Sequence, residues 1–435
     1  MKTYPAFYLC FLFFTILLAQ AGCTPPPTPP ATQTAEPTVT APLTTPLEPA
    51  SAVQSQVVQT PTAKPTAEST QVSVPTVTTE VILLESPTET SMPTDGAEIV
   101  PVGVIELEGA TLPAGFSLRK VIDVERPIGL AFSPAGNLYV STQIGELKIF
   151  SSVSGSSGQF DYANSINDLR FLHGMAFHPD NSDLYISTAG KLSILRDTDN
   201  DGLEDQLIPL VENIPFGLHQ NNVPKFGPDG MLYLGVGSTC DVCVEVDERS
   251  ASIMRFDPVT GDEEIVATGL RNPFDVAFHP ETGDLFATDN GRDDLGDFDP
   301  AEELNHIMAG NDYGWPDCWG NLEGSNCAGT VRATALFTAH SSVNNLVFYT
   351  GNSFPADYVN DLFALNFGSF LVQLDTGLQR VKLTPDGQGG FTAETEWFLT
   401  MPQGSFPLGL AQGADGSIYF GDYINGGVWR ISYGN

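Results

Sequence analysis

One short stretch of the chain spaces its carboxylates in a way that suits a metal ion. It consists of Asp197, Asp199, Asp201 and Asp205, with Gly202 at the sixth position. Alternating carboxylates followed by glycine are typical of the start of a calcium loop, where hard oxygen ligands wrap the cation around a tight turn. The twelfth position is Ile208, where an EF-hand has a bidentate Glu. We therefore predict a peripheral structural calcium site closed by Asp205, and a solvated acidic turn is the alternative.

The cysteines form a second group with possible chemistry. Cys10 and Cys23 lie near the N-terminus, and Cys240, Cys243, Cys318 and Cys327 form an even set further along. An even set favours disulfides in an exported protein, so we predict the pairs Cys240–Cys243 and Cys318–Cys327. Cys240-x-x-Cys243 could instead be half of a zinc site. No second close pair of Cys or His with finger-like spacing supports that alternative.

Export is indicated by residues 1–22. Lys2 is followed by an apolar run that is too short for a comfortable membrane span and fits a signal peptide. The run ends in Ala19-Gln20-Ala21-Gly22-Cys23, which is similar to a bacterial lipobox. We expect a lipid on Cys23 and anchoring to the outer face of the cell membrane. Position 20 is Gln where Leu is usual, so a secreted protein is the alternative.

Residues 23–99 and 100–435 differ sharply in composition. The first part is dominated by Pro, Thr, Ser, Ala and Val and has too little apolar surface to offset the entropy of ordering, which predicts a disordered stalk. The second part has a uniform composition with no evident linker and is expected to form one domain. The whole chain has a formal net charge of −35. Such a charge repels nucleic acid and anionic lipid, so membrane contact is expected through the lipid anchor only.

An internal repeat in the sequence indicates the fold that must position these residues. Six segments share an apolar strand, a turn with Pro, Asp or Gly, and a second strand. They are 129–140, 174–186, 223–234, 275–287, 345–365 and 409–420. Each is typical of a β-hairpin, and no stretch has a sustained helical period. We predict an all-β, six-bladed β-propeller with a ligand site at one mouth of its central channel; a β-sandwich is the alternative.

Several motifs within these repeats resemble a known family. They are Leu270-Arg-Asn-Pro-Phe-Asp-Val-Ala-Phe-His-Pro, Thr288-Asp-Asn-Gly-Arg-Asp-Asp-Leu-Gly-Asp, Glu302-Glu-Leu-Asn and Tyr313-Gly-Trp-Pro-Asp-Cys. They are similar to the glucose/sorbosone dehydrogenases, the soluble sugar dehydrogenases that use pyrroloquinoline quinone (PQQ). The resemblance covers essentially the whole propeller. It implies PQQ- and calcium-dependent oxidation of an aldose hydroxyl by hydride transfer to the quinone, with an external electron acceptor.

The resemblance also implies roles for individual residues. His219 would be the catalytic base, and Gln220, Arg271 and Asn272 would contact the cofactor. Backbone carbonyls at Gly291 and Arg292 would hold the active-site calcium. Without the resemblance, a histidine that hydrogen-bonds a loop and an Arg-Asn-Pro turn would be the simpler interpretations.

The chain departs from the family at positions that normally contact PQQ. A Gln, a Lys and two Arg of the family are replaced at Leu169-Arg170, Phe367, Phe406 and Leu408. PQQ carries three carboxylates, so these losses should weaken its binding unless Arg170, Arg292 or another residue substitutes.

Three functional classes follow from the sequence. The first is a PQQ-dependent sugar dehydrogenase. The second is a cofactor-less propeller that binds carbohydrate or another ligand, favoured by the apolar replacements. The third is a metal-dependent lactonase, disfavoured by the motifs. Cys243 is followed by Val244, so no Cys-x-x-Cys-His haem motif is present at this pair, and a dehydrogenase would pass its electrons to another molecule.

Overall fold

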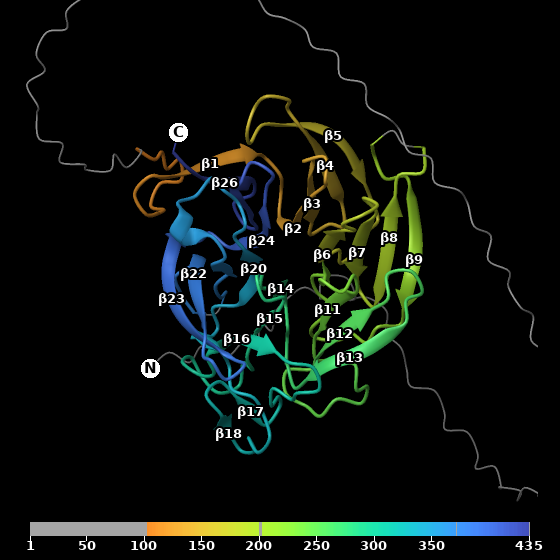
Figure 1. The fold of residues 1–435 in the computed structure, drawn as a ribbon, viewed down its shortest axis with the longest axis vertical. Coiled ribbons are helices and arrows are strands. Elements are labelled where there is room, and N and C mark those ends of the chain that lie inside the picture. The colour runs from red at the N-terminus through yellow and green to blue at the C-terminus, as the bar shows by residue number, and fades with distance from the viewer. Residues whose placement is uncertain (1–101, 200–201, 371, 435) are drawn as a thin grey trace, which may run out of the picture. The chain divides into compact units, whose positions relative to one another are not determined.

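The strands are arranged in six four-stranded antiparallel sheets around a central axis (Figure 1). The computed structural model describes residues 102–199, 202–370 and 372–434. The predicted all-β, six-bladed propeller is confirmed, and each repeated segment forms the first two strands of one blade. Predictions for residues 1–22, Cys23, 23–99 and Asp201 concern residues outside these ranges. No helix in the described ranges has the length and apolar character needed to cross a membrane.

The first three blades are built from consecutive strands. Blade 1 contains β2 (Pro127–Phe132), β3 (Leu138–Thr142), β4 (Leu147–Ser152) and β5 (Phe160–Ile166). Blade 2 contains β6 (Gly174–Phe177), β7 (Leu184–Thr188), β8 (Lys191–Arg196) and β9 (Gln206–Glu212). Blade 3 contains β10 (Lys225–Phe226), β11 (Leu232–Val236), β12 (Ser252–Phe256) and β13 (Glu263–Thr268).

The fourth and fifth blades carry the additions to this plan. Blade 4 contains β14 (Val276–Phe278), β15 (Leu285–Asp289), β16 (Glu302–Ile307) and β19 (Ala335–Phe337), and its last connection includes β17 (Cys318–Trp319) and β18 (Glu323–Gly324). Blade 5 contains β20 (Val343–Phe348), β21 (Leu362–Asn366), β22 (Gly377–Pro385) and β23 (Phe391–Thr400), with the short 3-10 helix η1 (Ala356–Tyr358) after β20. The Cys318–Cys327 disulfide, which is confirmed, fastens the β17–β18 connection.

The sixth blade closes the ring with both ends of the domain. Its first three strands are β24 (Pro407–Gln412), β25 (Ile418–Asp422) and β26 (Val428–Tyr433), and its outer strand is β1 (Phe116–Ile122). β1 and β26 pair antiparallel, with Phe116 opposite Tyr433 (Figure 1). The ring is therefore held shut by backbone hydrogen bonds between the first and last strands of the propeller.

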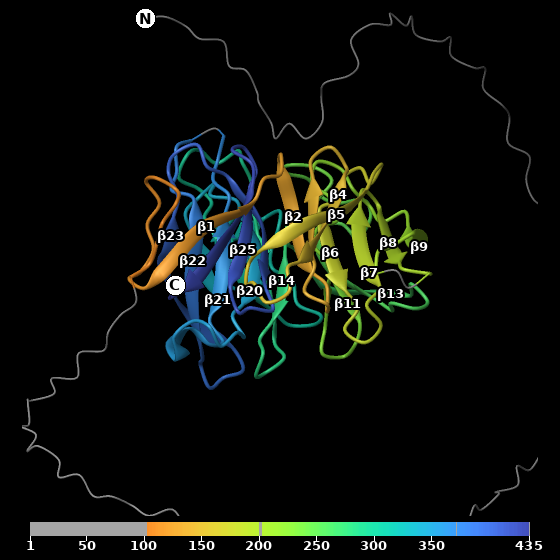
Figure 2. The same cartoon turned by 90° about the horizontal axis from the view of Figure 1, so that it is seen from above.

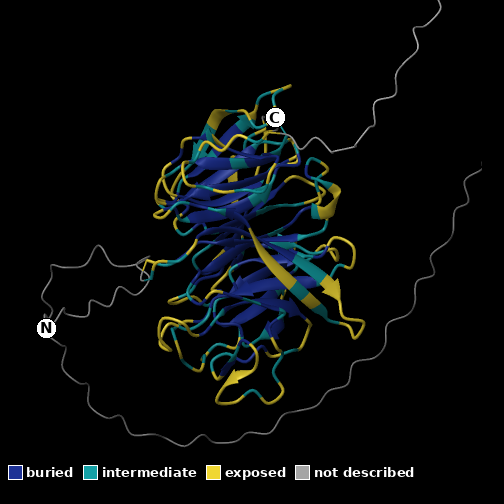
Figure 3. Cartoon of the chain, turned by 90° about the vertical axis from the view of Figure 1, so that its left-hand side faces the viewer, coloured by how far each residue is buried: buried dark blue, intermediate teal, exposed yellow. Residues whose placement is uncertain are grey.

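Burial explains why the second strand of most blades begins with a run of apolar residues. Every residue of β3, β11, β15, β21 and β25 is buried. Each of these strands belongs to a sheet that packs between two neighbouring blades, so both of its faces are covered. Figure 3 shows this buried interior, with exposed residues gathered in the loops and on outer strands.

Polar contacts link successive inner strands around the axis. The Asp275 carboxylate is fully buried and accepts the backbone N–H of Leu346 (3.1 Å), while Lys225 Nζ lies 3.7 Å away. Asn345 Oδ1 in turn accepts the backbone N–H of Gly409 (2.9 Å). Gly409 has φ +76°, and a Cβ there would lie 3.1 Å from the Gly129 backbone. These hydrogen bonds and the Lys225–Asp275 ion pair thus connect the inner strands of blades 3 to 6.

We expect Phe116→Ala in β1 to lower the free energy of unfolding by about 3–5 kcal/mol, because it empties a fully packed site where two blades meet the closing strand. Phe116 is 2% exposed, and its ring lies 4.8 Å from the ring of Phe354 and 4.8 Å from that of Phe398. Urea denaturation measures the change. Leu207→Ala on the exposed side of β9 is the control and should change stability by less than about 0.5 kcal/mol. Equal effects of the two substitutions would contradict this role for β1.

Candidate functional site at the mouth of the channel

Six predicted site residues lie in loops at one end of the propeller. Strand direction alternates within a blade, so the loop that enters a blade and the loop between its second and third strands share one end. His219 and Gln220 precede β10, Arg271 and Asn272 precede β14, and Gly291 and Arg292 follow β15. In the face-on view of Figure 1 the inner strands β6, β14 and β20 lie nearest the centre of the ring, and the edge-on view of Figure 2 shows loops gathered at the two ends of the strands. We call the end of the propeller at which these loops enter the inner strands the mouth.

His219 is fixed by the loop that follows β11. Its backbone N–H donates to Ser238 O (3.1 Å), and its ring Nδ1 lies 3.1 Å from the same oxygen and 2.9 Å from Ser238 Oγ. The backbone at Gly237 passes so close that a Cβ there would lie 2.4 Å from His219 Cβ. A larger residue at 237 would therefore displace the histidine.

These contacts determine which ring nitrogen of His219 carries the proton. Ser238 Oγ–H donates to the carbonyl oxygen of Cys240 (2.5 Å), so Oγ acts as an acceptor toward His219. The carbonyl oxygen of Ser238 can only accept. Nδ1 therefore carries the hydrogen, and Nε2, which has no hydrogen-bond partner among the described residues, carries the lone pair. Burial, and then the charge of Arg271, lowers the His219 pKa to about 3, so the ring is neutral at physiological pH.

Arg271 is buried, and protein groups bind its guanidinium on several sides. Nη2 lies 2.5 Å from Asp241 Oδ1 and 3.3 Å from Asp293 Oδ2. Nε donates to Asp241 O (3.1 Å), and Nη1 donates to Asn290 O (3.0 Å). One Nη1 hydrogen is left for a ligand. Arg271 therefore supplies positive charge to the site, but its guanidinium is not free to bind a ligand through two parallel hydrogen bonds.

The amide residues offer unused hydrogen-bonding capacity. Gln220 is buried, and its Oε1 has no partner among the described residues. The same holds for Oδ1 of buried Asn290, whose Nδ2 donates to Asn344 Oδ1 (3.0 Å). Asn272 Oδ1 accepts from Asn222 Nδ2 (3.2 Å), which leaves the Asn272 amide nitrogen available. Buried polar atoms without partners are costly and mark positions where a ligand can satisfy them.

The loop at Gly291 and Arg292 has two free carbonyls. Within the described ranges, no group donates a hydrogen bond to the carbonyl oxygen of either residue, whereas that of Asn290 is taken by Arg271. The Arg292 side chain points elsewhere: it pairs with Asp294 at 2.5 Å and lies over the Trp319 ring at 5.2 Å. Arg292 can therefore offer its backbone to a cation while its side chain is engaged in blade 4.

Three buried carboxylates hold the mouth loops in place. Asp289 accepts the backbone N–H of Arg271 (2.9 Å) and of Asn272 (2.6 Å). Glu302 accepts the N–H of Gly291 (2.6 Å) and of Ser342 (3.1 Å), and neighbouring Glu303 accepts that of Gly320. Burial raises the pKa of all three groups, that of Glu302 to about 7.

Sequence reasoning missed an ionic group beside the predicted residues. His340 Nδ1 lies 3.5 Å from Asp293 Oδ1, and its Nε2 contacts Gly296 O at 2.7 Å. The hydrogen bond with Asp293 raises the His340 pKa to about 9. Asp241, which holds Arg271, was also missed. Asp241 lies within the Cys240-x-x-Cys243 motif, and Asp293 lies within the motif that begins at Thr288. No feature of the sequence pointed to His340.

The opposite side of the mouth is apolar. Phe367 and Leu408, at two positions where the family has cations, are buried in one cluster with Ile128 and Tyr423, and Phe406 packs against it. Exposed Phe370 stacks on Phe406 with ring centroids 4.6 Å apart. Three of the departures from the family, Phe367, Phe406 and Leu408, therefore form one continuous patch, whereas Leu169 is buried in a different cluster. Arg170, a suggested substitute, is exposed and forms no ion pair with a described residue.

The predicted peripheral calcium loop lies between β8 and β9, at the opposite end of blade 2 from the mouth. Asp197 Oδ2 accepts the N–H of Gly202 (2.8 Å), and the Asp205 carboxylate accepts the Thr198 hydroxyl (2.8 and 2.9 Å). Asp201 lies outside the described residues, and calcium binding by Asp197, Asp199, Asp201 and Asp205 stays a prediction.

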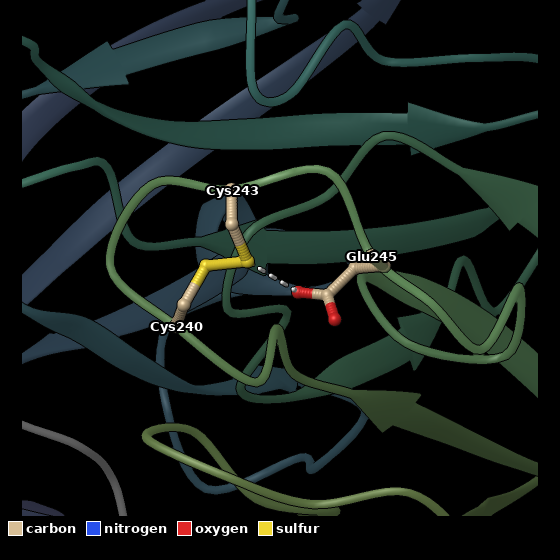
Figure 4. A group of neighbouring side chains, drawn as sticks. All are labelled: Cys240, Cys243 and Glu245. Carbon is tan, nitrogen blue, oxygen red and sulfur yellow. Dashed lines mark hydrogen bonds between the residues drawn. A yellow bond between two sulfur atoms is a disulfide. The ribbon is translucent and has the colours of Figure 1, made fainter. Parts of the chain in front are cut away.

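Cys240, Cys243 and Glu245 form the one group in the described ranges with three potential metal ligands within 4.8 Å of one another (Figure 4). The predicted Cys240–Cys243 disulfide is confirmed, and it leaves neither thiolate free for a metal.

The model of the family described as Glucose / Sorbosone dehydrogenase matches residues 124–422. The chain belongs to the glucose/sorbosone dehydrogenase family. An uncharacterized protein of Borreliella burgdorferi is 25% identical over 358 residues, which cover 74% of this chain and 90% of that protein.

Two solved structures have a similar fold. The holo PQQ domain of the Coprinopsis cinerea pyranose dehydrogenase has a TM-score of 0.65 and 19% identity, and covers 76% of this chain and 100% of that one. The calcium structure of the Trichoderma reesei carbohydrate-active enzyme of family AA12 has a TM-score of 0.64 and 18% identity, and covers 76% and 98%. At these identities the likeness shows that the fold is shared.

We expect the His219 ring to stay neutral, with its proton on Nδ1, when the pH falls from 7 to 5. Its pKa of about 3 leaves protonation negligible in that range. Ring ¹⁵N chemical shifts of selectively labelled protein report both the charge and the tautomer. The same histidine in the urea-unfolded chain is the control and should titrate near 6.5. A native midpoint near 6.5 would contradict the environment described for His219.

Proposed function

We propose that this protein oxidises an aldose hydroxyl with PQQ and calcium bound at the channel mouth. The observation that carries the proposal is His219, whose Nδ1 is held by Ser238 and whose Nε2 has no hydrogen-bond partner among the described residues, while burial and the charge of Arg271 keep its ring neutral by lowering its pKa. Membership of the glucose/sorbosone dehydrogenase family and the fold shared with sugar dehydrogenases support it.

The residues at the mouth fit such a cofactor on one side. The free carbonyls of Gly291 and Arg292 would hold calcium, a cation that prefers oxygen ligands. The amides of Gln220 and Asn272 and the remaining Nη1 hydrogen of Arg271 would contact polar atoms of PQQ. On the other side, Phe367, Phe406 and Leu408 offer apolar contacts and no charge. We therefore expect weaker PQQ binding than in members that keep all the cations.

The protein's own contribution to the reaction is proton transfer and orientation. When bound, PQQ supplies a two-electron acceptor for hydride. His219 Nε2 accepts the hydroxyl proton as the substrate's C–H bond is broken, and Nδ1–H stays bonded to Ser238. The negative charge of Asp293 favours the imidazolium formed in this way.

The apolar patch favours a second candidate, a propeller that binds a ligand without PQQ. Its basis is the cluster of Phe367, Phe406 and Leu408 at positions where the family places cations. A planar or apolar face of a carbohydrate could stack there. The two candidates differ in whether PQQ binds at all.

We expect the purified protein, given PQQ and excess calcium, to reduce an artificial dye in the presence of an aldose. His219→Asn should lower kcat about 10²- to 10⁴-fold, because the Asn amide can still donate to Ser238 but cannot replace the base. PQQ binding, measured by titration calorimetry, should change little.

His178→Asn, in a turn at the other end of blade 2, is the matched control and should keep full turnover. Failure of PQQ to bind at high micromolar concentration with calcium present would refute the dehydrogenase and favour the binding propeller.

We also propose export with a lipid anchor on Cys23, on the basis of the sequence of residues 1–23. In the native host, the wild-type protein should fractionate with membranes. Cys23→Ser should be released or left unprocessed, because the lipidated side chain is missing. Immunoblots of membrane and soluble fractions measure this, and an identical distribution of the two forms would refute anchoring.

A further inference from the structure

The loop between β11 and β12 contains a four-residue ring closed by the Cys240–Cys243 disulfide. Figure 4 shows the disulfide and the Glu245 carboxylate beside it. Glu245 accepts the backbone N–H (2.8 Å) and the hydroxyl (2.6 Å) of Thr239, the residue just before the ring. A disulfide sulfur has no proton to donate, so the 3.8 Å approach of Glu245 to Cys243 is a packing contact. The ring is therefore fixed both by its covalent closure and by this carboxylate.

The ring reaches the proposed base through Ser238, which is fully buried. The carbonyl oxygen of Cys240, inside the ring, accepts the Ser238 hydroxyl hydrogen (2.5 Å). This leaves Ser238 Oγ as an acceptor for His219 Nδ1–H (2.9 Å). If the Cys240 carbonyl moves away, the hydroxyl hydrogen is free to turn toward His219. Nδ1 can then accept from this hydroxyl, and only the longer contact with the Ser238 carbonyl oxygen (3.1 Å) still favours the Nδ1–H form, so the other ring tautomer gains stability.

The ring also reaches the buried cation. Asp241 lies between the two cysteines, and its backbone oxygen and carboxylate both bind the Arg271 guanidinium, at 3.1 and 2.5 Å. Ser238 N–H donates to the Arg271 carbonyl oxygen at 2.7 Å, which connects the two branches. A single covalent ring thus holds partners of both His219 and Arg271.

We propose that the Cys240–Cys243 ring is a positioning element that sets the tautomer of His219 and the place of Arg271, so that reduction of this disulfide switches the site off. This inference rests on the proposed function for its effect on turnover. Its effect on His219 does not depend on any cofactor. Both cysteines are partly exposed and hence accessible to a thiol reductant.

The test compares the two disulfides of the domain. In a Cys318→Ala, Cys327→Ala background, dithiothreitol reduces only Cys240–Cys243. Ring ¹⁵N shifts of His219, measured without PQQ, should show Nδ1 protonated before reduction and a large rise in the Nε2-protonated form afterwards. Reoxidation should restore the first spectrum. An unchanged tautomer after complete reduction, verified by thiol titration, would overturn the proposal.

Turnover provides a second measurement. Cys240→Ala, Cys243→Ala should lower kcat about tenfold or more with little change in KM for the sugar, since the wrong tautomer impairs the base and not sugar binding. Cys318→Ala, Cys327→Ala is the matched control and should keep kcat within about twofold. Equal losses in both variants would indicate a general structural effect and overturn the proposal. If no variant and no wild-type preparation turns over, the proposed function fails, while the tautomer measurement still decides this inference.

Discussion

The mouth of this propeller depends on buried carboxylates that act as acceptors for loop backbones. Loops that leave a sheet lose the hydrogen bonds of its ladder, and their N–H groups must find other partners when buried. Asp289 and Glu302, on adjacent strands of blade 4, supply these partners to the loops that contain Arg271, Asn272 and Gly291. Because burial penalises their charge, the carboxylates are retained only where several donors converge. Blade 4 is therefore the rigid base on which the site is built.

The sequence was sufficient to predict the architecture and several residues of the site, but not the contacts between those residues and their partners. The repeated strand–turn–strand segments identified all six blades, because each blade reuses one hairpin with its own apolar pattern. They did not identify β1 as the closing strand, since Phe116–Ile122 lies outside the repeat and pairs with the far end of the chain. Motif resemblance selected His219 and Arg271. It could not show that Asp241 and Asp293 engage the Arg271 guanidinium, because such contacts depend on how loops from different blades meet.

The mouth combines two chemically different halves. Polar loops of blades 3 and 4 present a neutral imidazole, amides and carbonyls, whereas blades 5 and 6 present the cluster that contains Phe367 and Leu408. A ligand with one oxygen-rich edge and one planar apolar face satisfies both halves better than a uniformly charged molecule. The apolar residues at the positions where the family has cations pack on one another. A single substitution of one of them by Lys or Arg would therefore bury an unpaired charge.

Closure of blade 6 by β1 has a consequence for biosynthesis. The contact between Ser117 and Gly434 spans 317 residues of chain, so the first strand of the propeller to be synthesised is the last to find its partner. Until β26 has been made, β1 presents unpaired backbone groups and the apolar side chain of Phe116, which makes the nascent chain prone to mispairing. Loop-closure entropy grows only slowly with length, so the delay costs time more than stability. Termination anywhere before β26 would leave an open ring, so the native fold can form only after β26 has been synthesised.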